Sequence, residues 1–155
     1  MARKILIAFD DSENAMRAVR YVAETFSPEN EVKLFSVVLD TAAMCAMDSP
    51  ELIPYFRTRQ SDFCTLEDKK RSLLQEAVER AQEILKQAGF PEKNVTGTIQ
   101  EKKKGVARDI AEEAKSYDLV VLGKRGLSGI EEFLLGSVSQ KVLHAAKKQS
   151  VLLVS

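Results

Sequence analysis

Five short segments of strand character alternate with stretches of helical periodicity, and this alternation limits the folds open to the chain. Four are apolar runs, at residues 4–9, 31–39, 118–122 and 150–154, and the fifth, at residues 95–101, alternates weakly between apolar and polar residues, as an outer strand does. Neighbouring parallel strands need a crossover connection, and a helix between each pair supplies one of the usual right-handed kind. We therefore predict an α/β fold: an open five-stranded parallel sheet with helices on both faces.

Apolar residues recur at helical spacing between these runs. Ser12 is a good helix N-cap, and helices are predicted behind it, over residues 66–88, behind Gly105, and over residues 137–147. Residues 40–65 show no sustained period. We expect a long loop there, with at most one short helical turn.

The length favours one domain covering residues 1–155, which is long enough to bury a core of its own. The 23 basic and 23 acidic residues balance, so neither nucleic acid nor an anionic membrane is favoured as a partner. No apolar run reaches the roughly 18 residues of a membrane span, and the N-terminus does not resemble a signal peptide. We expect a cytoplasmic protein.

The chain has two cysteines, Cys45 and Cys64. They are too few for a disulfide framework and lack the spacing of a metal site, so we expect inert thiols in a reducing compartment. A redox-sensing role is the alternative.

A glycine-rich segment near the C-terminus carries the functional signal. Residues 123–129 read GKRGLSG behind a buried strand, and residues 136–139 read GSVS at the start of the last predicted helix. Glycines let backbone N–H groups approach a ligand, and the first turn of a helix attracts anions. Ser137 and Gln140 have the spacing of a capping box. We expect this segment to bind the phosphates of a nucleotide.

Other nucleotide and catalytic motifs are missing. The first strand is followed by DDSEN rather than a dinucleotide-binding glycine pattern, and Gly123-Lys124 is followed by Arg125 rather than the Ser or Thr of a P-loop. The single histidine, His144, falls within the last predicted helix, so no nucleophile has a convincing base. We expect no catalytic residues and no metal ligands.

The spacing Gly123, two residues, Gly126, nine residues, Gly136, Ser137 resembles the nucleotide-binding signature of the universal stress protein family, in its ATP-binding subgroup. The resemblance covers nearly the whole chain. It implies a Rossmann-like sheet in the order 3-2-1-4-5, similar to adenine nucleotide alpha hydrolases, with ATP across the carboxyl ends of the strands. An open α/β sheet independently predicts a ligand crevice at that edge.

The resemblance also implies which residues meet the nucleotide. The backbone near Ala8 and Val37 would border the adenine, and Asp10 would face the ribose. The floor of the site would be formed by Leu122 and Gly123. The phosphates would be met by Gly126, Gly136, Ser137, Val138 and Ser139.

Two departures from the family pattern leave alternatives open. Lys124 and Arg125 stand where a small residue is common; they could neutralise phosphate, face solvent, or pair with Asp10 or Asp11. Asp11 adds a carboxylate near the expected ligand. This negative charge weakens the case for tight binding of the highly charged ATP, so ADP and AMP are alternatives. Beside phosphates, Asp10 makes physical sense only as a ribose acceptor or as a ligand of Mg²⁺, and we favour the ribose.

The last apolar run, with Val151, Leu152, Leu153 and Val154, is expected at the sheet edge, where pairing with a second copy would cover it. The resemblance implies a homodimer through this strand. Three functions stay open: a regulatory ATP-binding stress protein with at most slow hydrolysis and an unknown protein partner, a nucleotide-free interaction or chaperone-like protein, and an enzyme that transfers AMP or cleaves ATP.

Overall fold

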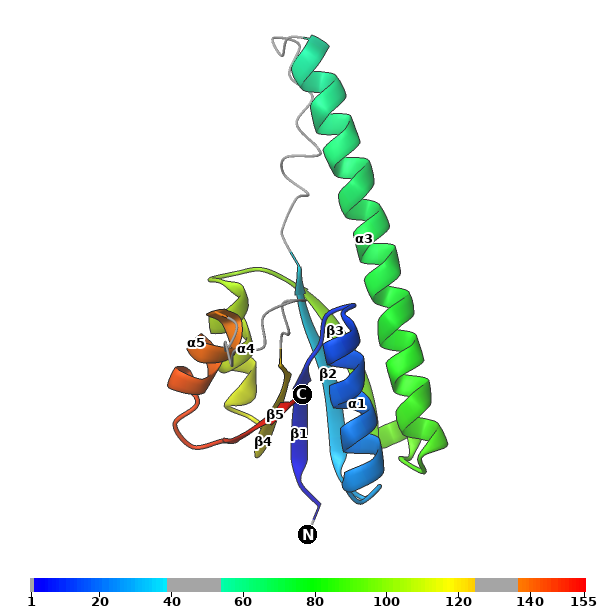
Figure 1. Cartoon of the computed structure of the whole chain (residues 1–155), viewed down its shortest axis with the longest axis vertical. Coiled ribbons are helices and arrows are strands. Elements are labelled where there is room, and N and C mark those ends of the chain that lie inside the picture. The colour runs from blue at the N-terminus through cyan, green and yellow to red at the C-terminus, as the bar shows by residue number, and fades with distance from the viewer. Residues whose placement is uncertain (1, 39–53, 125–136) are drawn as a thin grey trace.

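The computed structural model describes residues 2–38, 54–124 and 137–155, with side chains at 2–38, 62–124 and 138–155. Five strands form one parallel sheet in the order β3-β2-β1-β4-β5, which confirms the predicted topology (Figure 1). The strands are β1 (Lys4–Ala8), β2 (Glu31–Val38), β3 (Val95–Glu101), β4 (Leu119–Gly123) and β5 (Ser150–Val154).

Helices cover both faces of this sheet. They are α1 (Glu13–Thr25), α3 (Pro54–Gln87), α4 (Val106–Ala114) and α5 (Ser137–Ala145), with a 3-10 turn, η1 (Glu92–Asn94), before β3. In Figure 1, α1 and α3 lie on one side of the sheet and α4 and α5 lie on the other. Successive strand residues point to opposite faces, so each central strand must be apolar on both.

The core is accordingly divided into two clusters. Ile5 and Ile7 of β1 pack on the side of α1 and α3, while Leu6, between them, packs with α4 and α5 on the other side. All three side chains are fully buried. The lack of polar alternation in the strands therefore follows from a sheet covered on both faces.

The start of α3 differs from the prediction. We expected a loop through residue 65, but the helix begins at Pro54, so the loop prediction is wrong for residues 54–65. Proline suits the first turn of a helix because its missing N–H is not needed there. The first half of α3 projects beyond the sheet, and Leu66 is 51% exposed (Figure 1). With no core to face, this half carries no apolar stripe for periodicity to detect.

Cys64 of α3 is disulfide-bonded, so the expectation of an inert free thiol is wrong for this residue. Cys45 lies outside the described residues, as do residues 40–53 of the predicted loop. None of the helices in the described segments combines the length and apolar character that a bilayer span requires.

Candidate functional site

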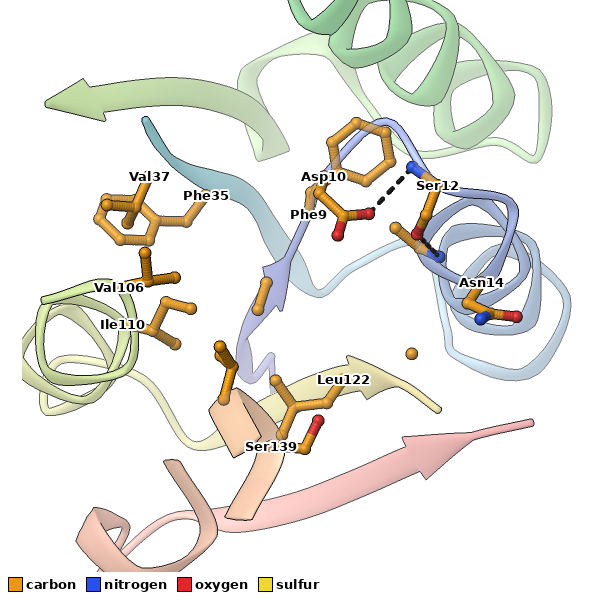
Figure 2. Close-up of a pocket in the computed structure, with 14 residues that line it drawn as sticks. Phe9, Asp10, Ser12, Asn14, Phe35, Val37, Val106, Ile110, Leu122 and Ser139 are labelled. Carbon is orange, nitrogen blue, oxygen red and sulfur yellow. Dashed lines mark hydrogen bonds between the residues drawn. The ribbon is translucent and has the colours of Figure 1, made fainter. Parts of the chain in front are cut away.

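A cavity of about 120 Å³ opens at the carboxyl ends of β1, β2 and β4 (Figure 2). It lies where the chain leaves the sheet in opposite directions, since α1 leads from β1 toward β2 while β4 flanks β1 on the other side. Strand ends that diverge in this way leave a crevice that no connecting segment fills. The crevice predicted from the element order is therefore present.

The cavity brings together seven of the eleven residues that the sequence singled out: Ala8, Asp10, Val37, Leu122, Gly123, Val138 and Ser139. Arg125, Gly126 and Gly136 lie outside the described residues. Ser137 is the first helical residue of α5, but its side chain is outside the described set. The structure thus describes the end of the site formed by the strands and the first turn of α5.

Sequence reasoning missed the wall that α4 contributes. Val106 and Ile110 of α4 face Phe35 and Val37 of β2 across the cavity (Figure 2). The periodicity of α4 identified Val106 and Ile110 only as an apolar helix face. A helix that packs on β2 must bring its first turn to the same edge as the strand ends, and this argument would have placed both residues at the site.

The turn from β1 into α1 fixes the polar rim of the cavity. The Asp10 carboxylate accepts a hydrogen bond from the Ser12 backbone N–H at 2.9 Å. The Ser12 hydroxyl accepts one from the Ala15 backbone N–H at 3.2 Å, which confirms Ser12 as the N-cap of α1. The first bond orients the Asp10 carboxylate at the end of β1, and the second fixes the start of α1 behind it.

Gly123 is required by packing rather than by an unusual backbone conformation. A Cβ at this position would lie 2.7 Å from the Asn14 carbonyl oxygen and 3.1 Å from the Ala15 backbone nitrogen. Among the described glycines, positive φ angles occur only at Gly89 and Gly105. The end of β4 therefore touches the first turn of α1 directly, a reason for glycine that the tight-turn interpretation did not include.

The loop from β3 to α4 is held by a buried carboxylate. Asp109 is only 4% exposed and accepts hydrogen bonds from the backbone N–H groups of Lys103 at 2.7 Å and Lys104 at 3.1 Å. Burial opposes ionisation of Asp109, but these bonds and the Lys103 charge outweigh it and lower its pKa. Asp109 thereby fixes the first turn of α4, which carries Val106 to the cavity.

The lowered pKa of Asp109 predicts an acid-dependent contribution to stability. Ionised Asp109 stabilises the fold above the unfolded-state pKa of 3.8, and this contribution is lost as the pH falls through the lower folded-state pKa. We expect Asp109→Ala to lower the free energy of unfolding at pH 7 by about 1–3 kcal/mol, because two N–H groups lose their acceptor. Asp109→Asn keeps an acceptor but not the charge and should lose less. Urea unfolding from pH 7 to 2 measures both, and an Asp109→Ala deficit that does not shrink in acid would contradict this role.

An open five-stranded parallel sheet with a crevice between its diverging central strands defines the Rossmann-like class of α/β folds. The chain matches the family model described as "Universal stress protein family" over residues 1–155, and it belongs to this family. Universal stress protein YxiE of Bacillus subtilis is 31% identical over 144 residues, covering 92% of each chain. A universal stress protein of Mycolicibacterium smegmatis is 28% identical over 143 residues, and the match spans only 45% of that longer relative.

Solved structures share the fold at low identity. A universal stress protein from Archaeoglobus fulgidus superposes with a TM-score of 0.71 at 16% identity, covering 100% of this chain and 99% of the other. A family protein from Arabidopsis thaliana, solved with AMP bound, gives 0.63 at 17% identity and covers 98% and 90%. A universal stress protein in complex with cAMP gives 0.60 at 22% identity and covers 99% and 98%.

Proposed function

We propose that the protein binds an adenine nucleotide in the cavity at the ends of β1, β2 and β4, and that it acts as a regulatory protein in stress response. The observation that carries the proposal is the convergence of Ala8, Asp10, Val37, Leu122 and Gly123 on one cavity at the diverging strand ends. Family membership and the AMP and cAMP complexes of two proteins of the same fold support it.

The shape of the cavity suggests how the nucleotide lies. Its volume of about 120 Å³ is below the roughly 300–1,000 Å³ of pockets that enclose a whole small ligand, so it suits only part of a nucleotide. The apolar side chains of Val37, Val106 and Ile110 suit the flat adenine ring. The Asp10 carboxylate suits the ribose hydroxyls, since carboxylates accept hydrogen bonds but repel phosphate.

The phosphates would then extend toward the start of α5. Val138 and Ser139, in the first turn of that helix, line the cavity. First-turn N–H groups are not bonded within the helix and lie at the positive end of its dipole, which favours an anion there. Arg125, Gly126, Gly136 and Ser137 belong to this part of the proposal. Mg²⁺, where present, would accompany the phosphates of ATP.

Filling the adenine space should weaken binding without unfolding the protein. Val37→Phe adds a ring beside Val106 in the space proposed for adenine, so we expect AMP affinity to fall roughly ten-fold or more, which corresponds to about 1.4 kcal/mol of binding free energy. Val38→Phe is the matched control, since its neighbouring side chain points to the opposite face of β2. Calorimetric titration with AMP, ADP and ATP, with and without Mg²⁺, measures the effect.

Each outcome of that titration bears on a different function. Equal AMP affinities in Val37→Phe and Val38→Phe would place the nucleotide elsewhere. A wild-type protein that binds none of the three nucleotides would favour the nucleotide-free interaction protein. Sustained release of phosphate or AMP from ATP would favour the enzyme.

We also propose that β5 forms a homodimer interface. It is an edge strand that pairs only with β4 within the described sheet, and Val151, Leu152 and Leu153 are only half-buried. Apolar edge strands need a cover, and a second copy provides one. Sedimentation equilibrium should give about twice the 17.3 kDa chain mass for the wild type and the single-chain mass for Leu152→Arg. A monomeric wild type at high concentration would contradict the dimer.

A further inference from the structure

A second cavity, of about 610 Å³, lies between the start of α4 and the second half of α5. Lys104 and Arg108 line it from the side of α4, and Lys141 and His144 line it from α5. We call it the α4–α5 cavity. It shares only Val106 with the cavity of the proposed nucleotide site.

Its charge departs from that of the whole chain. Acidic and basic residues balance overall, yet the residues lining this cavity include three permanent cations and a histidine but no carboxylate. Among the described side chains, none of these four residues forms an ion pair. The Glu112 carboxylate of α4 is bonded to Lys115 at 2.7 Å, and this bond, with the charges of Lys115 and then Lys104, lowers the pKa of Glu112. The cations thus surround a space whose lining has no carboxylate, while the neighbouring Asp109 is bonded to the backbone N–H groups of Lys103 and Lys104.

The backbone that carries these cations is held in place. Asp109 binds the N–H of Lys104 at 3.1 Å, which fixes this residue at the rim. Ala107, next to Arg108, and Val142, next to Lys141, are both buried in the core cluster that joins α4 to α5. A site whose supports are already ordered loses less entropy when a ligand binds.

From these observations we infer that the α4–α5 cavity binds a small phosphate-bearing anion with several negative charges. Lysine and arginine are the side chains that proteins use for phosphate, through charge-assisted hydrogen bonds. The volume falls within the roughly 300–1,000 Å³ of small-molecule sites, which suits a compact anion better than an extended nucleic acid. This inference does not depend on nucleotide binding in the first cavity.

Inorganic pyrophosphate is the probe that tests it. Titration followed by amide NMR should move the signals of Lys104, Ala107 and Lys141, and calorimetry on the same protein gives the affinity. Arg108→Gln combined with Lys141→Gln should weaken pyrophosphate binding about ten-fold or more, since two charge-assisted contacts are lost. Lys147→Gln combined with Lys148→Gln is the matched control. It removes the same charge just behind α5, at residues that do not line the cavity.

Three results would overturn the inference. The first is pyrophosphate affinity that is unchanged in the cavity variant, or reduced equally in the control, which would indicate bulk charge attraction. The second is competition between pyrophosphate and AMP with shifts confined to the start of α5, which would assign the anion to the first cavity. The third is binding of single-stranded RNA through the same four residues while pyrophosphate fails to bind. AMP affinity should stay unchanged in the cavity variant, so failure here is distinct from failure of the proposed nucleotide site.

Discussion

Gly123→Ala is expected to lower the free energy of unfolding by about 1–3 kcal/mol, and Gly123→Val by more, because added side-chain atoms overpack the contact between β4 and α1. The new Cβ would lie 2.7 Å from the carbonyl oxygen and 2.8 Å from the carbonyl carbon of Asn14. Both are backbone atoms, so no side-chain rotation relieves the overlap. The end of β4 or the first turn of α1 must move, and both elements border the proposed nucleotide cavity. AMP affinity should therefore fall together with stability.

Gly97→Ala is the matched control for this prediction. A Cβ there would approach the Val78 Cγ1 atom at 2.7 Å and the Gln82 Nε2 atom at 3.1 Å, both of which are side-chain atoms that can move. Gly97 is on β3, away from the cavity, so this variant should lose less stability and keep its AMP affinity. Urea unfolding and calorimetric titration of the two variants make the comparison. Equal loss of stability in both, with AMP affinity retained in Gly123→Ala, would contradict the packing role and the site together.

The difference between Gly123 as predicted and as found shows what local sequence patterns omit. The spacing of the glycines indicated a site behind β4, and the structure places Gly123 there. The reason that only glycine fits is a contact with α1, more than a hundred residues earlier in the chain. Such contacts depend on how helix and strand pack, which a local pattern does not contain.

The positions of the central strands were predictable because they depend on the residue types within each strand rather than on one contact with a distant element. The central strands β1 and β4 lie within one residue of the predicted runs 4–9 and 118–122, because burial against helices selects the residue types of a strand directly. Residues 54–65, the part of α3 that was not predicted, have no such selection. They lie in the half of the helix that projects past the sheet, next to the exposed Leu66, and their sequence shows no sustained helical period. Prediction therefore succeeded where the core constrains the sequence and failed where it does not.

Phe35 joins the core to the candidate site, and its replacement should have the largest effect on stability. The side chain is 1% exposed, belongs to the core cluster with Ile110 of α4, and lines the cavity (Figure 2). Lys33, two residues earlier on the same face of β2, holds its ammonium 5.8 Å from the centre of the ring and binds Glu113 of α4 at 2.6 Å. Burial lowers the pKa of Lys33, but the bond to Glu113 together with the charges of Tyr117 and Glu113 outweighs it, so the pKa is raised. Phe35 thus lies beneath a charged link between the sheet and α4.

We expect Phe35→Ala to cost about 3–5 kcal/mol of unfolding free energy, since it leaves a cavity under α4, and Phe35→Leu to cost less than about 1.5 kcal/mol. Loss of the ring also removes the support of Val106, so AMP affinity should fall in Phe35→Ala and stay close to the wild type in Phe35→Leu. Urea unfolding at pH 7 and AMP titration of both variants supply the two readouts. Ile7→Val serves as a core control on the opposite face of the sheet, with an expected cost of about 0.5–1.5 kcal/mol and no change in affinity. If Phe35→Ala loses stability but binds AMP like the wild type, the nucleotide does not lie between β2 and α4.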